Sequence, residues 1–411
     1  MRNLPERAGR AVAALGPGLI SGFSDNDPTT VATLAVIGAS TTYGLTWLVV
    51  LVIPMLAVVQ SIAARIGAVS ESGLEDCVRR RYGRPVAFAA LFAVLAVNIV
   101  TLAADLEGGG AALQIITGIR YQWWIVPFAV LTAVLLIRGH YTSIANVLKY
   151  LTLVFVSYVV AAFLVRPDWL MVLRGSLVPH VEWTNAYIDG AIALLGTTLT
   201  SYAYVWETVE ASEERVPLQR LGLVQAEAAA GIALAGLSFW FIVVATGATL
   251  GVHHHLVMTA QDAADALIPV AGRYAGFLFG VGLLGSALLA VPVLAGTSAY
   301  VMAEAFGWRS SLDAAFTKAP GFYGSLIASL ALGSGIALAG VSPIKLLFIS
   351  GIAGGIATPF TLALMMLIGR DAKVMGQNPI DARIAVAGWA VTGVVVVAAA
   401  AYLYRTFVPQ P

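Results

Sequence analysis

Apolar residues run in long stretches along this chain, and polar residues gather in short segments between them. A helix needs about 20 mostly apolar residues to cross a bilayer, so each stretch of that length predicts one membrane span. Windows of this kind give eleven spans, at residues 12–39, 43–66, 86–118, 122–138, 146–166, 185–211, 221–251, 273–304, 322–341, 344–369 and 384–406. The pattern therefore predicts an all-α polytopic membrane protein with about 11 transmembrane helices.

Composition supports the same class. Of the 411 residues, 59% are hydrophobic and only 11% are charged, which leaves too little polar surface for a soluble globular protein of this length. Cys77 is the single cysteine, which excludes a disulfide framework and a cysteine metal cluster. We expect a multi-pass protein of the cell's inner (plasma) membrane, with the lipid bilayer as its surroundings, no removable signal segment, no nucleic-acid partner, no obligate protein partner and no cofactor.

The basic residues predict the orientation of the chain. If the N-terminus is cytoplasmic, most of the 23 Lys and Arg residues fall in segments on the cytoplasmic side. Cytoplasmic loops of membrane proteins carry an excess of these residues, so the bias supports both the number of spans and a cytoplasmic N-terminus.

The first predicted span is interrupted by polar residues near its middle. Asp25 and Asp27 lie there, followed by Pro28. The residue before a proline avoids the helical region, whereas Pro28 suits the first position of a new helix with Asp27 as its N-cap. We therefore expect a broken helix that is unwound over Ser24 to Asp27. Such breaks form substrate sites at the bilayer midplane in transporters; the alternative is that Asp27 only caps the second half-helix and faces a wet crevice.

The sixth predicted span is the second unusual one. Its centre carries a cluster of hydroxyl residues, Thr197, Thr198, Thr200 and Ser201. These side chains compete with the helix for backbone partners, which makes a break near residues 198–201 plausible. The alternative is ordinary hydrogen bonding between helices.

The two interrupted spans are five apart in the order of crossing. Two inverted five-helix repeats would bring them face to face, with the last span as an addition. We therefore predict one transmembrane transporter domain over residues 1–411, with a first repeat at 1–166, a second at 185–369 and an extra helix at 384–406.

Further acidic residues lie within or beside the spans. Asp105 and Glu107 precede three glycines in the third span, which suggests close helix packing beside a polar passage; a structural pair and a proton or ion pathway are equally open. Glu207 and Glu210 share one face of the sixth span and could line an inner vestibule that attracts cations. The following pair, Glu213 and Glu214, is interpreted as a solvated helix end.

Two other clusters favour plain interpretations. The triplet His253, His254 and His255 lies in a predicted outer loop, and we interpret it as a polar loop rather than a metal site because further ligands are absent nearby. The tenth span carries Gly351, Ala353, Gly354 and Gly355, small residues that permit close approach of another helix.

The chain resembles the natural-resistance-associated macrophage protein (Nramp) family of divalent-metal transporters, and in particular its diverged prokaryotic relatives. The similarity covers nearly the whole chain and lies in Gly16-Pro17-Gly18 with Asp27-Pro28, Gly196-Thr197-Thr198 with Tyr202, Ala104-Asp105-Leu106, Val291-Pro292-Val293-Leu294-Ala295-Gly296, Ala303-Glu304-Ala305-Phe306-Gly307-Trp308, Pro343-Ile344-Lys345 and Arg370-Asp371-Ala372-Lys373-Val374-Met375-Gly376. The resemblance implies a bundle of the amino-acid-transporter type, with metal bound between broken first and sixth helices.

The resemblance also assigns site positions, and several differ from the family pattern. Asp27 matches the family's acidic ligand, while Thr30 stands where the family has Asn. Thr197 falls at a site-lining alanine, and Thr200 replaces a methionine whose thioether favours softer metals. The pair Ser201-Tyr202 stands where classical members have Pro-His.

These changes leave an all-oxygen site, which suits hard ions of the Mg²⁺ or Mn²⁺ class. The expected substrate ligands are the side chains of Asp27, Thr30, Thr197 and Thr200 and the carbonyls of Ser24 and Thr197, with Ser201 and Tyr202 also in the site. The missing histidine argues against proton coupling, although Asp25, Asp105 and Glu107 remain candidate proton carriers.

Other functions remain open from the sequence. A half-helix N-terminus at Pro28 also suits a small anion or organic substrate, such as bicarbonate, a carboxylate or an amino acid, on the same fold. A receptor or structural membrane protein is a third possibility. An enzyme is not predicted, because the chain shows neither a nucleophile with a base at useful spacing nor a phosphate loop.

Overall fold

The computed structural model describes residues 27–138 and 156–407, except residues 216, 254–256, 258, 269–271, 310, 313 and 315. In these ranges each of the eleven predicted spans contains a helix. They are α3 (Pro28–Thr41), α4 (Thr46–Ser70), α6 (Arg84–Thr117), α7 (Gln122–Arg138), α9 (Val156–Val165), the pair α11 (Asn185–Thr198) and α12 (Ser201–Glu213), α13 (Leu218–Thr246) with a π-helical turn (Gly247–Gly251), α16 (Ala275–Phe306), α17 (Pro320–Ala337), α18 (Pro343–Arg370) and α20 (Ala382–Phe407).

Short helices connect these spans. They are α5 (Leu74–Tyr82), α10 (Trp169–Leu177), α14 (Ala260–Asp265) and α19 (Ala372–Met375). Seven of the described helices are long and apolar enough to cross a membrane on their own. The chain is therefore an all-α polytopic membrane protein, as predicted, while its division into repeats at the stated boundaries stays a prediction.

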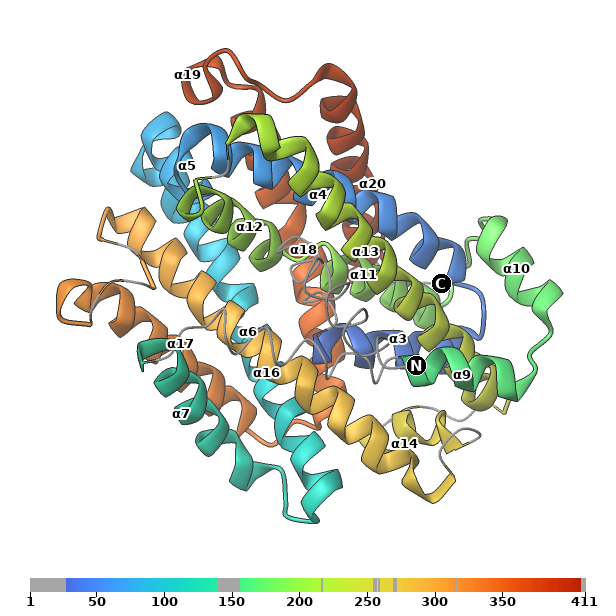
Figure 1. The fold of residues 1–411 in the computed structure, drawn as a ribbon. Coiled ribbons are helices and arrows are strands. Elements are labelled where there is room, and N and C mark those ends of the chain that lie inside the picture. Colours follow the sequence, from blue (N-terminus) through green and yellow to red (C-terminus); the bar gives the residue numbers. More distant parts are fainter. Residues whose placement is uncertain are drawn as a thin grey trace, which may run out of the picture.

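The connecting segments gather at two ends of the bundle, as alternating spans require. At one end Arg81 of α5 pairs with Asp371, which precedes α19. Figure 1 shows α5 and α19 close together there, far from α14. At the other end the Tyr121 hydroxyl donates to the Val341 carbonyl at 3.4 Å, and Arg405 pairs with Asp189. Which end faces the cytoplasm stays a prediction from the basic residues.

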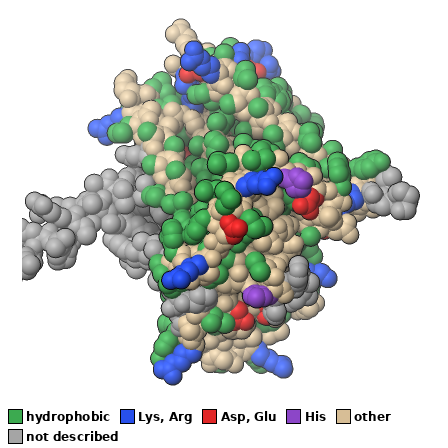
Figure 2. Space-filling model, turned by 90° about the vertical axis from the view of Figure 1, so that its right-hand side faces the viewer, with side chains coloured by type: hydrophobic (Ala, Val, Ile, Leu, Met, Phe, Trp, Pro, Cys, Tyr) green, Lys and Arg blue, Asp and Glu red, His purple; other side chains and the backbone are tan. Residues whose placement is uncertain are grey.

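Large apolar side chains cover the outside of the bundle. Phe92, Trp123, Val397 and Phe407 are each more than two thirds exposed. Figure 2 shows hydrophobic side chains over much of the face turned to the viewer, with charged side chains in separate groups. Such a surface is stable where lipid tails cover it.

Glycines allow the helices at the centre to approach closely. A Cβ atom at Gly196 of α11 would lie 1.9 Å from the Gly351 carbonyl oxygen of α18 and 2.1 Å from the Gly355 nitrogen. A Cβ atom at Gly108 of α6 would lie 2.9 Å from the Cβ of Pro28. The packing role predicted for the tenth-span glycines is confirmed, and these contacts fix α11 and the start of α3 at the centre of the bundle.

Candidate substrate-binding site

The site begins at the N-terminus of α3, where Asp27 caps the helix. Asp27 has extended backbone angles, and its Oδ1 accepts a hydrogen bond of 2.6 Å from the Thr30 nitrogen. Pro28 follows as the first helical residue, a position at which its missing N–H removes no helical hydrogen bond. The predicted cap is thus confirmed. Ser24 and Asp25, predicted to lie in the unwound segment, fall outside the described residues.

The sixth span breaks where its hydroxyl residues were expected to break it. Helix α11 ends at Thr198, α12 begins at Ser201, and Thr200 between them is extended. The break frees the Leu199 carbonyl, which accepts a hydrogen bond from the Thr358 hydroxyl of α18 at 3.3 Å. Because a backbone carbonyl without a partner is costly inside a membrane, this bond supports the open turn.

The start of α3 and the break between α11 and α12 meet through side chains. The Tyr202 hydroxyl donates to Asp27 Oδ2 at 2.8 Å. The hydroxyl oxygens of Thr30 and Thr197 are 2.9 Å apart and share a hydrogen bond. All four residues are buried. Four of the residues proposed from the sequence therefore come together.

Thr200 and Ser201 lie beside this meeting point. Both are buried within the break. Thr200 makes no side-chain cap on α12, and the Ser201 hydroxyl has no hydrogen-bond partner among the described residues. A buried hydroxyl without a partner is uncommon, and it is available to a ligand that enters the break.

A second carboxylate supports the first turn of α3. Asp105 Oδ1 of α6 accepts hydrogen bonds from the Thr29 hydroxyl at 2.8 Å and the Thr29 nitrogen at 3.2 Å. Its other oxygen, Oδ2, is buried and has no partner among the described residues. Glu107 is also buried, and it directly precedes Gly108, the glycine that packs against Pro28. Thr29 was missed from the sequence because nothing local shows which helix its hydroxyl will face.

The described residues provide no basic partner for the acidic side chains of this region. Among the described residues, none of the ion pairs includes Asp27 or Asp105. A buried carboxylate without a counter-ion is expensive. Nor do the described residues contain a group of three or more His, Cys, Asp or Glu side chains arranged so that they could hold a metal ion. Among the described residues, a cation would therefore be held by one or two carboxylates together with neutral oxygen atoms.

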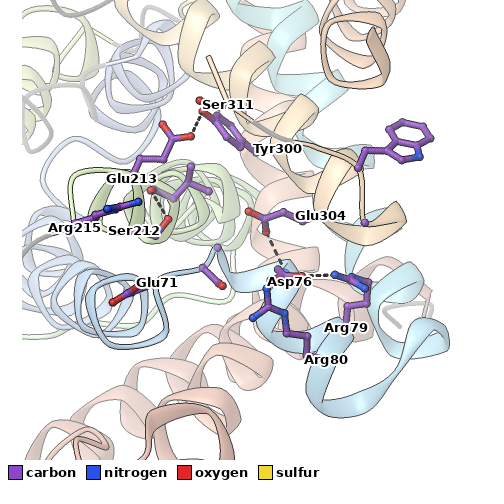
Figure 3. A pocket seen from close by; sticks show the side chains of 15 residues that line it. Glu71, Asp76, Arg79, Arg80, Ser212, Glu213, Arg215, Tyr300, Glu304 and Ser311 are labelled. Carbon is purple, nitrogen blue, oxygen red and sulfur yellow. Dashed lines mark hydrogen bonds and ion pairs between the residues drawn. The ribbon is translucent and has the colours of Figure 1, made fainter. Parts of the chain in front are cut away.

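A cavity of about 570 Å³ lies at the α5 end of the bundle, and it differs from the predicted vestibule. Its wall includes Glu213 of α12, whereas Glu207 and Glu210 are not among its lining residues. Glu213 is exposed, as interpreted from the sequence, and also accepts a hydrogen bond from the Tyr300 hydroxyl at 2.8 Å. Figure 3 shows this side chain directed toward Tyr300 across the cavity wall. Glu207 is buried and Glu210 is half-buried.

The outlying polar residues of the sequence do not join the site. Glu214 is exposed at the end of α12, in keeping with a solvated helix end. His253 is exposed after the π-helical turn, while His254 and His255 lie outside the described residues.

Comparison with known proteins places this chain in a family. The family model described as "Natural resistance-associated macrophage protein-like" matches residues 18–405. A divalent metal cation transporter, MntH, of Deinococcus radiodurans is 28% identical, with 97% of this chain and 91% of the relative covered. The MntH of Xylella fastidiosa is 27% identical, with coverages of 94% and 84%.

Solved structures agree on the fold. The crystal structure of a mutant of the Eremococcus coleocola manganese transporter has a TM-score of 0.72 at 17% identity, covering 97% of this chain and 88% of that one. MhsT in complex with L-phenylalanine has a TM-score of 0.62 at 14% identity, covering 94% and 97%. Because the family model matches nearly the whole chain, this protein belongs to the natural resistance-associated macrophage protein-like (Nramp) family.

Proposed function

We propose that this chain transports a hard divalent metal cation of the Mg²⁺ or Mn²⁺ class across the membrane, and that the cation binds between the start of α3 and the break after α11. The observation that carries the proposal is the buried Asp27 carboxylate, which faces Tyr202 and lies beside the Thr30–Thr197 pair with no basic partner among the described residues. A divalent cation would supply the missing positive charge.

The chemistry of the ligands supports hard ions. The groups that meet are a carboxylate, a phenol hydroxyl and threonine hydroxyls, all of which offer oxygen. Oxygen ligands suit Mg²⁺, Mn²⁺ and Ca²⁺, and softer metals prefer sulfur or imidazole. The MntH relatives and the manganese transporter structure support a divalent metal as substrate.

Burial of the site supports alternating access. Asp27 and Thr30 are at most 1% exposed, so a cation reaches them only when helices move. Two hydrogen bonds must also rearrange, because the Tyr202 proton occupies Asp27 Oδ2 and the two threonine hydroxyls satisfy each other. Turning these hydroxyl hydrogens away would present their oxygen lone pairs to the cation.

The α3 N-terminus is less suited to an anion. Asp27 brings a negative charge there, and it already occupies the Thr30 N–H that an anion would use. A small carboxylate or bicarbonate substrate would have to displace this contact and overcome repulsion by Asp27.

Uptake into proteoliposomes tests the proposal. Asp27→Asn keeps a good N-cap but removes the charge, so we expect uptake of Mn²⁺ to fall about a hundredfold. Asp168→Asn is the matched control, because Asp168 also caps a helix, α10, from an exposed position where it accepts hydrogen bonds from Leu170 and Met171. We expect that variant to transport at the wild-type rate.

Competition experiments identify the substrate class. Excess Mg²⁺ should inhibit Mn²⁺ uptake by the wild-type protein, and bicarbonate should not. Wild-type vesicles that take up neither metal, or Asp27→Asn vesicles that take up Mn²⁺ normally, would contradict the proposal.

A further inference from the structure

Helix α5 begins without a side-chain cap of its own. Its N-cap is Gly73, which offers no side chain, so the first N–H groups need partners from elsewhere. The Leu74 nitrogen donates to the Thr208 hydroxyl of α12 at 3.1 Å, and the Asp76 nitrogen donates to Glu304 Oε2 of α16 at 3.2 Å. We call these five residues the α5 junction. It joins a connecting helix to two membrane spans.

Glu304 fits this position closely. The oxygen atoms of a carboxyl group can accept hydrogen bonds from the free N–H groups at a helix N-terminus. A Cβ atom at Gly73 would lie 2.0 Å from Glu304 Oε1 and 2.5 Å from Oε2, so a larger residue at position 73 would exclude this carboxylate. Gly73 has φ −69°, an angle open to any residue. Contact with Glu304, rather than backbone conformation, therefore explains the glycine.

The α5 junction is connected to the substrate site through α12. This helix begins at Ser201 in the break and carries Tyr202, the residue that contacts Asp27. Seven residues after Ser201, Thr208 binds the start of α5, and Glu213 near the helix end accepts the Tyr300 hydrogen bond from α16. A rigid helix transmits a movement at one end to the other, so α12 cannot shift at the site without straining these contacts.

The cavity of about 570 Å³ lies against the same contacts. Gly73, Asp76 and Glu304 line it together with Glu213 and Tyr300. Figure 3 shows Glu304 directed toward Asp76, with Arg79 and Arg80 beside Asp76. Both arginines pair with the Asp76 carboxylate. Separation of α5 from α16 would thus widen this cavity along α12.

We propose that Glu304 is a positioning residue of transport. By capping α5, which contacts α12 through Thr208, it holds α12 in the position seen in this structure. When α12 moves, α5 separates from Glu304. The role in transport rests on the proposed function. The contact itself can be tested without any transport assay.

The chain contains a natural probe of this contact. Cys77 is its single cysteine, lies in α5 one residue after Asp76, and is 3% exposed. Burial raises the pKa of this thiol to about 11, so its reaction with N-ethylmaleimide should be slow in the closed junction. Labelling of the full-length protein, followed by intact-mass measurement, reports how often α5 opens.

Substitutions at Glu304 should change this rate in graded fashion. Glu304→Ala removes the oxygen that accepts the hydrogen bond from the Asp76 nitrogen, and we expect labelling about tenfold faster. Glu304→Gln retains an acceptor oxygen of nearly the same length, so it should restore much of the protection. Equal labelling of the wild-type protein and Glu304→Ala would overturn the proposal.

Gly73→Ala attacks the same contact from the other side. The added Cβ would displace the carboxylate, so labelling should again rise about tenfold, while Gly335→Ala in α17, where a Cβ would meet nothing within 4 Å, should leave it unchanged. In a Glu304→Ala background the clash is gone, and Gly73→Ala should add little. Coupled residues show such non-additivity, so fully additive effects would contradict the assigned contact.

Transport measurements then separate this inference from the proposed function. With Glu304→Ala we expect the maximal Mn²⁺ uptake rate to change at least threefold while the Kd for Mn²⁺ stays within about twofold, because the residue does not touch the substrate. Faster labelling with an unchanged uptake rate overturns the positioning role. If wild-type protein transports no metal but the labelling is non-additive, the α5 junction stands and the proposed function fails.

Discussion

Helices α3 and α5 both begin at a carboxylate, but the two carboxylates come from different places. Asp27 is the residue directly before α3 and binds an N–H three residues ahead. Glu304 lies on α16, 228 residues along the chain from the nitrogen that it accepts. The same electrostatic requirement of a helix N-terminus is thus met once locally and once by a distant span.

The two capping groups, Asp27 and Glu304, differ in the partners that their oxygen atoms contact. Asp27 Oδ2 accepts a hydrogen bond from a rotatable group across the break, the Tyr202 hydroxyl, which can turn away. The Glu304 carboxylate is closed in by Gly73, with one oxygen on the Asp76 amide. A cap whose second oxygen contacts a rotatable hydroxyl suits substrate binding, whereas a carboxyl group that faces the helix backbone suits fixing of a helix.

Replacing each carboxyl group by its amide tests whether the two caps have different functions. Asp27→Asn should weaken Mn²⁺ binding about a hundredfold in calorimetry, equivalent to about 2.8 kcal/mol, because the cation loses its charged ligand. Glu304→Gln should leave the Kd within about twofold. Similar losses in both variants would mean that the two caps do not have separate functions.

An intermediate effect is expected at Tyr202, the exchangeable partner of Asp27. Tyr202→His replaces a hard oxygen with an imidazole nitrogen, which Mn²⁺ accepts more readily than Mg²⁺. We expect the ratio of Mg²⁺ to Mn²⁺ dissociation constants to rise about tenfold. Tyr202→Phe serves as the control, since it removes the hydroxyl without adding a ligand. An unchanged ratio in Tyr202→His would place the ring outside the coordination sphere.

Removal of one neutral ligand should have a smaller effect on Mn²⁺ binding. Thr197→Val keeps the shape of the side chain but removes the hydroxyl that meets Thr30. Loss of one neutral oxygen should weaken Mn²⁺ binding about threefold, within the range of a single neutral hydrogen bond. Thr392→Val in α20, whose hydroxyl donates to the Gly388 carbonyl of its own helix, is the control. Equal affinities in both variants would remove Thr197 from the ligand set.

Much of the fold followed from the sequence because its signals are local. Long apolar runs predicted the spans, Asp27-Pro28 predicted the start of α3, and the hydroxyl cluster predicted the break between Thr198 and Ser201. Each signal acts within a few residues of the backbone that it shapes. Prediction of the tenth-span glycine packing succeeded for a related reason, since small residues permit close approach of whichever helix lies opposite.

The site was predicted less completely, because its contacts cross between spans. Helical periodicity placed Glu207 and Glu210 on one face, but it could not show that Glu213 would line the cavity instead. The Thr29 contact with Asp105 joins residues 76 positions apart, and neither residue signals its partner.

Local signals in the sequence were sufficient to predict a membrane bundle with a helix beginning at Pro28 and a break in its sixth span. The contacts of Tyr202 with Asp27, of Thr30 with Thr197 and of Glu304 with the start of α5 depend on tertiary packing, and the sequence did not reveal them. Local conformation depends on neighbouring residues and on the solvent they prefer. The pairing of distant polar groups depends on how whole helices pack, and here glycines such as Gly196 allow the backbones to come close enough for those pairs to form.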